Sequence, residues 1–251
     1  MKSKALLFGI NYVDNPESKL RGCVNDVINM STYLKTVAKY DSVDVFTDED
    51  DYNSVTARGI TRGIYHLAIQ SHRRKLERVW IHFSGHGTSI TDVDNDEVDN
   101  KDECIVPADY KRAGVITDDT IKLLLNMFHK NTKVICVFDC CHSGTIGDLQ
   151  YKYEARSNPS VQNTRTECKS KVVLISGCKD SQTSADAYNV NNLHKFSGAM
   201  TSCMLLALKN HKHPKVFDIL DDLRSFLKSK RFSQIPQLTS SFIIDEEFEL
   251  N

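Results

Sequence analysis

The sequence lacks the features that would assign it to a membrane-bound or nucleic-acid-binding class. No apolar run approaches the length that is needed to cross a bilayer. The formal net charge is only −1, with 32 basic and 33 acidic residues, so the charge balance favours neither nucleic acid nor an anionic membrane as a partner. The apolar start at Ala5–Ile10 is broken by Asn11 and Asp14 and has no small-residue cleavage site. We therefore expect a first strand there rather than a secretion signal.

The eight cysteines lack the pattern of a zinc site or of a disulfide scaffold. No CxxC pair occurs, and Cys136, Cys140 and Cys141 crowd one strand end while the others are scattered. Secreted disulfide scaffolds are usually smaller and richer in cysteine. We expect reduced thiols and a cytoplasmic location.

Short apolar runs alternate with helix-like segments along the chain. Strands are expected at Lys4–Ile10, Val43–Phe46, Val79–Phe83, Cys104–Pro107, Val134–Phe138, Val172–Ile175 and Ser241–Ile244. Helices are expected from about residue 24 to Ala38, at Ser54–Ser71, after Thr117, at Ser197–Leu208 and at Val216–Leu227. The first helix would bury Val24, Val27, Ile28, Tyr33, Leu34 and Val37. This alternation predicts one three-layer α/β domain around a mostly parallel sheet, with an exposed polar linker at 150–170.

Two of the expected strands end in reactive residues. Val79–Phe83 runs into Ser84, Gly85 and His86, and Val134–Phe138 runs into Asp139, Cys140 and Cys141. Chemistry in parallel sheets lies at the carboxyl ends of the strands, so neighbouring strands would bring His86 and Cys141 together. A thiol beside an imidazole is a nucleophile with a general base. The backbone N–H groups of Gly87 and Cys141 would then serve as oxyanion donors.

These two tips carry a family resemblance. The blocks FSGHG at 83–87 and DCCHSG at 139–144 resemble the dyad motifs of metacaspases, and the resemblance extends almost from end to end, including 176–186, 198–201 and 234–238. It implies a caspase-like fold, with a large-subunit-like region at 1–149 and a small-subunit-like region at 171–251. It also implies a monomeric cysteine endopeptidase in which Cys141, rather than Cys140, is the nucleophile. Strand alternation alone does not choose between these two thiols, because a parallel strand is buried on both faces.

The resemblance also identifies a primary specificity pocket. The matching positions here are Cys23, Asp26, Ser84 and Asp139. Two carboxylates at the base of a cleft attract an ammonium or guanidinium group and repel an aspartate side chain. We predict cleavage of protein substrates after Arg or Lys. Taken alone, Asp26 would more simply be an acid in the first turn of a helix.

Acidic residues suggest two metal sites. Asp92, Asp94 and Asp96 fall at EF-hand positions 1, 3 and 5, and Glu103 falls at position 12, but Glu97 stands where the turn needs Gly and no helix precedes the loop. The EF-hand is therefore disfavoured. The resemblance implies a different Ca²⁺ site with the ligands Asp102, Asp118, Asp119 and Asp148. Alternatively, Asp118 and Asp119 only begin a helix.

The polar linker contains possible self-cleavage positions at Lys152, Arg156, Arg165 and Lys169, although a plain connector would look the same. The chain lacks the long N-terminal extension of many relatives, so we expect a short form without a prodomain. Two other functions remain open: a catalytically weak scaffold of the same fold that binds basic peptides, and a calcium sensor built on the Asp92 loop.

Overall fold

The computed structural model describes residues 2–91, 101–140, 146–156, 159–162, 168–177, 186–188 and 196–251. Its centre is an eight-stranded sheet in the order β2-β1-β3-β7-β10-β13-β8-β9. The strands β2, β1, β3, β7 and β10 are parallel to one another, and β13, β8 and β9 continue the sheet in antiparallel pairing. The predicted α/β fold around a mostly parallel sheet is confirmed.

The sheet strands are as follows. Their bounds are β1 (Ser3–Gly9), β2 (Ser42–Thr47), β3 (Arg78–Ser84), β7 (Lys133–Asp139), β8 (Tyr151–Lys152), β9 (Ser160–Val161), β10 (Lys171–Ser176) and β13 (Gln237–Ser240). The central strands β1, β3, β7 and β10 are almost completely buried. They consist of continuous apolar runs rather than alternating ones, because helices cover both faces of a parallel sheet.

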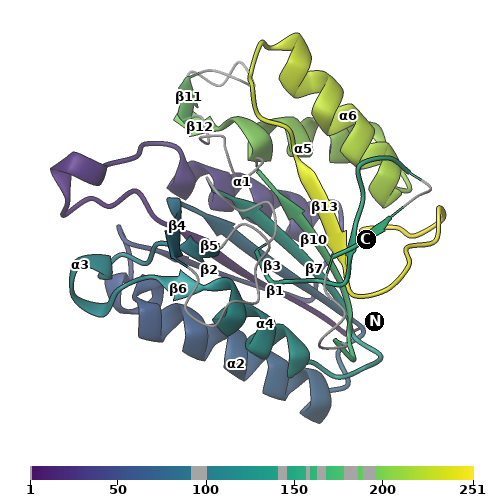
Figure 1. The fold of residues 1–251 in the computed structure, drawn as a ribbon, viewed down its shortest axis with the longest axis horizontal. Helices are drawn as coiled ribbons and strands as arrows, with labels where there is room; N and C mark the ends of the chain where they lie inside the picture. Colours follow the sequence, from purple (N-terminus) through teal and green to yellow (C-terminus); the bar gives the residue numbers. More distant parts are fainter. Residues whose placement is uncertain are drawn as a thin grey trace.

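Two layers of helices cover the sheet, as Figure 1 shows. One face carries α1 (Cys23–Thr36), α5 (Ala199–Asn210) and α6 (Val216–Ser229). The other face carries α2 (Ala57–Arg73) and α4 (Asp118–Asn126). Each layer has its own hydrophobic core, the first including Trp80 and the second including Phe83 and Phe138. The three layers predicted from the sequence are present.

Smaller elements surround the edge of the sheet at which the parallel strands end. They are η1 (Pro16–Ser18), η2 (Tyr52–Val55), α3 (Tyr110–Ala113), the three-stranded sheet of β4 (Gly87–Thr91), β5 (Lys101–Ile105) and β6 (Ile116–Thr117), and the pair β11 (Asp186–Tyr188) and β12 (Phe196–Gly198).

Helix α1 begins close to this edge, where Gly9 ends β1. A Cβ on Gly9 would lie 2.7 Å from the Cys23 carbonyl oxygen, so this helix start and strand end fit together only with glycine.

Part of the predicted linker belongs to the sheet. Strand β8 pairs with both β13 and β9, and Tyr153 is buried, with its hydroxyl accepting the Ile244 N–H at 2.7 Å. Residues 157–158 and 163–167 of this segment lie outside the described residues. The described part of 150–170 is therefore an edge of the sheet as well as a connection.

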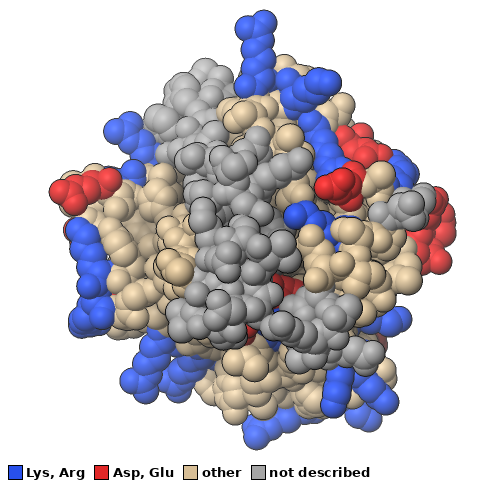
Figure 2. All heavy atoms as spheres, in the orientation of Figure 1, with Lys and Arg blue, Asp and Glu red and all other residues tan. Residues whose placement is uncertain are grey.

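The charged surface agrees with the balanced composition. Figure 2 shows Lys and Arg spread around the edge of one face and interrupted by acidic side chains, so the described part of that face has no continuous surface of one charge. No helix in the described ranges is both long and apolar enough to span a bilayer.

Candidate active site

The two reactive strand tips are neighbours. Strands β3 and β7 pair in parallel along their whole length, with Ser84 opposite Asp139. Beyond the last pair, the Gly85 N–H donates to the Asp139 carbonyl at 3.3 Å. The buried Cys140 follows. Cys141, its N–H and residues 142–145 lie outside the described residues, so the structure does not place the predicted nucleophile itself.

His86 is held by contacts on two sides. Its Nε2 lies 2.7 Å from the Ser18 carbonyl oxygen, and its backbone N–H donates to the Tyr12 hydroxyl at 2.8 Å. The rings of Tyr12 and His86 are tilted against each other with centroids 4.7 Å apart. A carbonyl oxygen only accepts hydrogen bonds, so Nε2 carries a proton and Nδ1 of the neutral ring keeps its lone pair. The imidazole can therefore act as a base through Nδ1.

Gly87, the predicted oxyanion donor, begins β4 directly after His86. His86 and Gly87 border a surface hollow of about 400 Å³. Its remaining lining is mixed: Val106, Val115 and Tyr110 are apolar or aromatic, and Glu17, Ser18 and Thr88 are polar. This hollow contains none of the predicted specificity-pocket residues.

Three of the four predicted specificity-pocket residues meet at one point. Asp26 accepts the Ser84 hydroxyl at 2.7 Å, and the Gly198 N–H reaches both of its oxygens at 2.8 and 3.0 Å. Asp139 accepts the N–H and the hydroxyl of Thr201 at 2.9 and 2.8 Å. These donors are neutral N–H and O–H groups. Asp26, Ser84 and Asp139 are all buried.

Gly198 shows how closely the two carboxylates approach. A Cβ on this residue would lie 2.3 Å from Oδ2 of Asp139 and 2.7 Å from Oδ2 of Asp26. Only glycine leaves room for both side chains against the backbone at this position. Cys23, the fourth predicted residue, is buried at the start of α1, three positions before Asp26 and therefore on the same side of the helix.

The predicted metal ligands are partly assembled. Asp102 lies in β5, Asp118 and Asp119 begin α4, and Asp118 accepts the backbone N–H groups of Glu103 and Asp119, both at 2.8 Å. Burial, followed by the negative charge of Asp148 and a smaller effect of Asp102, raises the pKa of Asp118 to about 7. Lys122 lies 3.3 Å from Asp148 and supplies one positive charge.

Carboxylate oxygens are the ligands that a hard cation prefers. The raised pKa of Asp118 shows that its surroundings do not fully stabilise the negative charge, which is the condition that an added divalent cation relieves. Across the described ranges, no three His, Cys, Asp or Glu side chains are already arranged as a formed metal site. Asp92, Asp94 and Asp96 of the disfavoured EF-hand lie outside the described residues, and Glu103 is buried in β5.

The candidate self-cleavage residues differ in their surroundings. Lys152 lies in β8 between two hydrogen-bonded partners, and Lys169 is exposed. Arg156 pairs with Asp218 at 2.9 Å and with Asp221 at 2.6 Å, both on α6. Arg165 lies outside the described residues.

Sequence reasoning did not identify several residues that complete the site. Thr201 and Gly198 bind the pocket carboxylates, and Tyr12 and Ser18 bind His86. Gly198 and Thr201 lie in the block 198–201, which is one of those that carry the family resemblance, so the sequence could have indicated that they belong to the site. The role of Ser18 depends on a backbone carbonyl, which no sequence pattern identifies.

The chain is similar to known proteins over most of its length. The family described as metacaspase, peptidase C14 domain, matches residues 3–150, more than half of the chain. Metacaspase-3 of Trypanosoma brucei brucei is 35% identical over 259 residues, covering 96% of this chain and 72% of that protein. Metacaspase-1 of Yarrowia lipolytica is 32% identical over 296 residues, covering 97% of this chain and 62% of that protein.

A solved structure shows the same fold. The crystal structure of protein GSU0716 from Geobacter sulfurreducens matches with a TM-score of 0.69 at 23% identity, covering 99% of this chain and 97% of that one. On the family match and the two curated relatives, this chain belongs to the metacaspases, a family of cysteine peptidases that act on proteins.

Proposed function

We propose that this protein is a calcium-stimulated endopeptidase that cleaves after Arg or Lys, with Cys141 as nucleophile and His86 as general base and acid. The observation that carries this proposal is the meeting of Asp26 and Asp139 against Gly198, at the strand edge from which His86 projects. A buried pair of carboxylates binds a cationic side chain far better than an acidic or neutral one.

The chemistry follows from the orientation of His86. Its Nδ1 takes the proton of the Cys141 thiol, and the thiolate attacks the carbonyl carbon of the substrate bond. The N–H groups of Gly87 and Cys141 donate to the resulting oxyanion. As the carbon–nitrogen bond breaks, the imidazolium returns its proton to the leaving amine, which leaves a thioester on Cys141. Water, deprotonated by His86, then attacks the thioester and releases the acid product and the free thiol.

We infer the orientation of the substrate from the positions of the Asp26–Asp139 pair and of the hollow beside His86. An Arg or Lys side chain in the acidic pocket brings the bond that follows it to the dyad. The leaving amine receives its proton from His86, so the residue after the cleaved bond lies on the His86 side. We assign the hollow that contains Val106, Val115 and Tyr110 to that residue. An aliphatic or aromatic side chain suits this lining better than an acidic one, because Glu17 stands in the same hollow.

A calcium ion would be held by Asp102, Asp118, Asp119 and Asp148, and would offset the negative charge that raises the pKa of Asp118. Asp148 adopts a left-handed backbone conformation with φ of 44° directly after Gly147, which has φ of 91°. Both residues lie shortly after Cys141 in the chain. Fixing the Asp148 carboxylate would therefore order the connection that leads back to the nucleophile.

Self-cleavage in the linker is favoured where the backbone is accessible. A peptide bond must leave its sheet pairing to enter an active site, so Lys152 in β8 is a poor position. Arg156 is held on α6 by two ion pairs. The exposed Lys169, together with Arg165, is the better candidate. Mass spectrometry of the active protein against Cys141→Ala identifies the bonds that are cut.

We place the protein in the cytoplasm as a monomer. The six cysteines that the structure describes form no disulfide, which suits a reducing compartment.

The proposal is tested with peptides that differ only at the cleaved position. Peptide amides ending in Arg, Lys or Asp are assayed with calcium and with excess chelator, using the protein and Cys141→Ala. We expect turnover of the Arg and Lys peptides only, loss of turnover in chelator, and no turnover by Cys141→Ala. Tight binding of the Arg peptide without any turnover by the unaltered protein would instead indicate a scaffold for basic peptides.

A further inference from the structure

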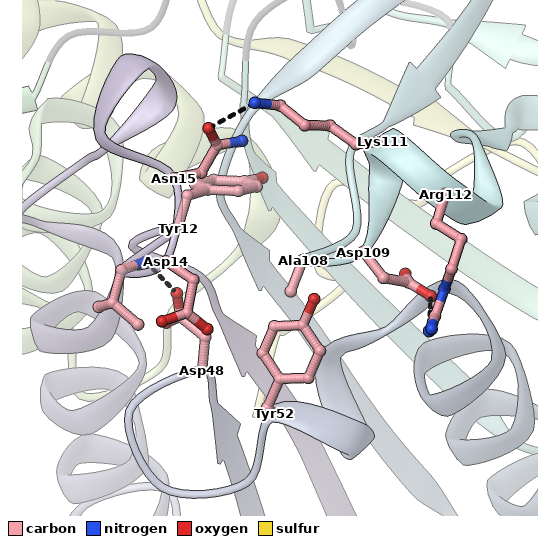
Figure 3. A pocket seen from close by; sticks show the side chains of 10 residues that line it. Tyr12, Asp14, Asn15, Asp48, Tyr52, Ala108, Asp109, Lys111 and Arg112 are labelled. Atoms are coloured by element: carbon pink, nitrogen blue, oxygen red, sulfur yellow. Dashed lines mark hydrogen bonds and ion pairs between the residues drawn. The ribbon is translucent and has the colours of Figure 1, made fainter.

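Tyr12 stands in an unusual backbone conformation. Its φ is 54°, in the left-handed region that non-glycine residues seldom adopt. The residues on both sides of it donate to one carboxylate: the N–H groups of Asn11 and Val13 reach Asp48 at 2.9 and 3.0 Å. Figure 3 shows Asp48 beside the loop that carries Tyr12, Asp14 and Asn15. A carboxylate that accepts two nearby backbone N–H groups stabilises such a turn, as bound anions do in backbone nests.

The conformation of Tyr12 places its hydroxyl against the segment that carries His86. The hydroxyl donates to the Val106 carbonyl at 2.6 Å and accepts the His86 N–H at 2.8 Å. The Val106 N–H in turn donates to the His86 carbonyl at 3.0 Å. Gly85 allows this approach, because a Cβ there would lie only 3.0 Å from the hydroxyl. Two hydrogen bonds therefore hold the Tyr12 hydroxyl, and the side chain is buried.

The same loop supplies the second partner of His86. The Leu20 N–H donates to the Asn11 carbonyl at 2.9 Å, so residues 11–20 close on themselves. This loop presents the Ser18 carbonyl to Nε2 of His86 at 2.7 Å. One loop therefore contacts the ring nitrogen, the ring face and the backbone N–H of His86. Asp48, which follows the end of β2, is the residue that anchors the start of this loop.

We propose that Asp48 is a positioning residue for the dyad, which acts through the left-handed conformation of Tyr12 to hold the His86 imidazole. The proposal depends on the proposed peptidase function. The described contacts of Asp48 are with the loop rather than with His86, whereas Tyr12 contacts both the ring and the backbone N–H of His86. Neither residue is one of the predicted pocket residues. Weakening this link changes the placement of the general base and leaves the site for the Arg side chain in place.

The test compares Tyr12→Phe and Asp48→Asn with the unaltered protein. Small misplacement of a catalytic group costs about 10- to 100-fold in rate, so we expect kcat for an Arg peptide to fall by that factor with KM changed by roughly twofold or less. The rate at which iodoacetamide alkylates Cys141 is also measured against pH by mass spectrometry. Loss of the imidazole partner moves the midpoint of that profile up toward about 8.5, the ordinary pKa of a thiol.

Two variants serve as matched controls. Tyr153→Phe removes another buried hydroxyl that accepts a backbone N–H, but it lies at the β8 edge of the sheet. Asp14→Asn removes an exposed carboxylate from the same loop. We expect both to keep kcat and the alkylation profile, and Tyr153→Phe to lower only the melting temperature. Because Tyr12 and Asp48 act on the same group, the double variant should lose no more activity than the worse single variant.

Several outcomes overturn the inference. The inference is wrong if Tyr12→Phe folds and has the same kcat and the same alkylation profile as the unaltered protein, whether or not Asp48→Asn folds. Additive losses in the double variant would also contradict a shared route through His86. Absence of turnover by the unaltered protein would refute the proposed function instead, and the alkylation profile would still report whether Tyr12 acts on the dyad.

Discussion

At the scale of single residues, the acidic pocket is built from side chains that are far apart in the sequence. Asp26 lies on α1 and Asp139 ends β7, and they meet only because Gly198 lacks a side chain. Both carboxylates accept hydrogen bonds from N–H or hydroxyl groups of residues on other elements. The proposed specificity pocket therefore depends on three elements rather than on one motif.

Removing the charge of Asp26 tests this pocket. Asp26→Asn keeps the size of the side chain but loses one of two negative charges, so we expect kcat/KM for Arg peptides to fall about 30- to 100-fold, or roughly 2–3 kcal/mol. Asp44→Asn on β2 removes an acid that pairs with Lys4 at the other end of the sheet and should leave kcat/KM unchanged. Unchanged cleavage of Arg peptides by Asp26→Asn would contradict the pocket assignment.

His82 makes stability depend on pH. It is buried in β3 beside Thr201, and burial lowers its pKa to about 3. Because the folded pKa is lower than the unfolded value of about 6.5, the unfolded chain binds this proton first as pH falls. The contribution of His82 to the free energy of unfolding should therefore be constant above about pH 6.5 and should decrease by about 1.4 kcal/mol per pH unit below it. Asp118, whose pKa is raised to about 7, contributes with the opposite sign, so the His82 contribution is the difference in slope between the unaltered protein and a His82 variant.

Urea unfolding between pH 4.5 and 7.5 checks this dependence. We expect His82→Leu to remove that part of the slope, even though its overall stability is lower. Substitution of the exposed His66 should leave the slope intact. A slope that is the same in His82→Leu and in the unaltered protein would show that other groups cause the acid sensitivity.

At the scale of elements, sequence patterns predicted the parts of the fold that are buried on both sides. The runs that became β1, β3, β7 and β10 are continuous and apolar, and the helix start at Thr117 is capped as expected, with the Thr120 N–H donating to the Thr117 hydroxyl. The last strand was predicted wrongly at Ser241–Ile244. It is Gln237–Ser240, because these residues pair with β10. Ser241 donates its backbone N–H to the Val172 carbonyl, but it accepts the Val172 N–H through its side-chain hydroxyl, and the strand ends there.

Helix α1 shows a second limit of sequence patterns. The prediction that Ile28 and Val37 are buried is wrong, since they are 48% and 52% exposed. Ile28 follows Val27 directly and therefore points about 100° away around the helix, so only one of the two can face the sheet. Apolar character alone could not choose between them, and the packing of α1 on β1 and β2 made the choice.

The start of α4, where Asp118 accepts the Glu103 N–H of β5, is the place at which we expect calcium to act. We predict that calcium raises the melting temperature and the turnover of the protein, since a ligand that binds only the folded state stabilises it. In Asp118→Asn we expect both effects to need at least about tenfold more calcium, because a buried carboxylate ligand is lost. Asp44→Asn is the matched control. Full turnover in excess chelator, or an equal calcium response of Asp118→Asn, would contradict this site.

At the scale of the whole molecule, the site is an outcome of topology. Strand order places β3 beside β7, which could be predicted from two similar strand tips, and the chain then returns through β12 and α5 to complete the acidic pocket. The contact of β12 and α5 with this site could not be derived from the spacing of residues in the sequence, because it depends on how α1, β12 and α5 pack around Gly198. The family resemblance supplied the predicted pocket residues, and the structure shows that Asp26, Ser84 and Asp139 lie close together.

The most direct test of the account is covalent labelling with a peptidyl acyloxymethyl ketone that ends in Arg. The thiolate displaces the carboxylate group of this reagent, forming a stable thioether that mass spectrometry locates. We predict one adduct per chain, on Cys141, with little labelling in His86→Ala or Asp26→Asn and none by the matching reagent that ends in Asp. An adduct on Cys140 or another thiol, or equal labelling by the Arg and Asp reagents, would contradict a Cys141–His86 dyad beside an acidic pocket.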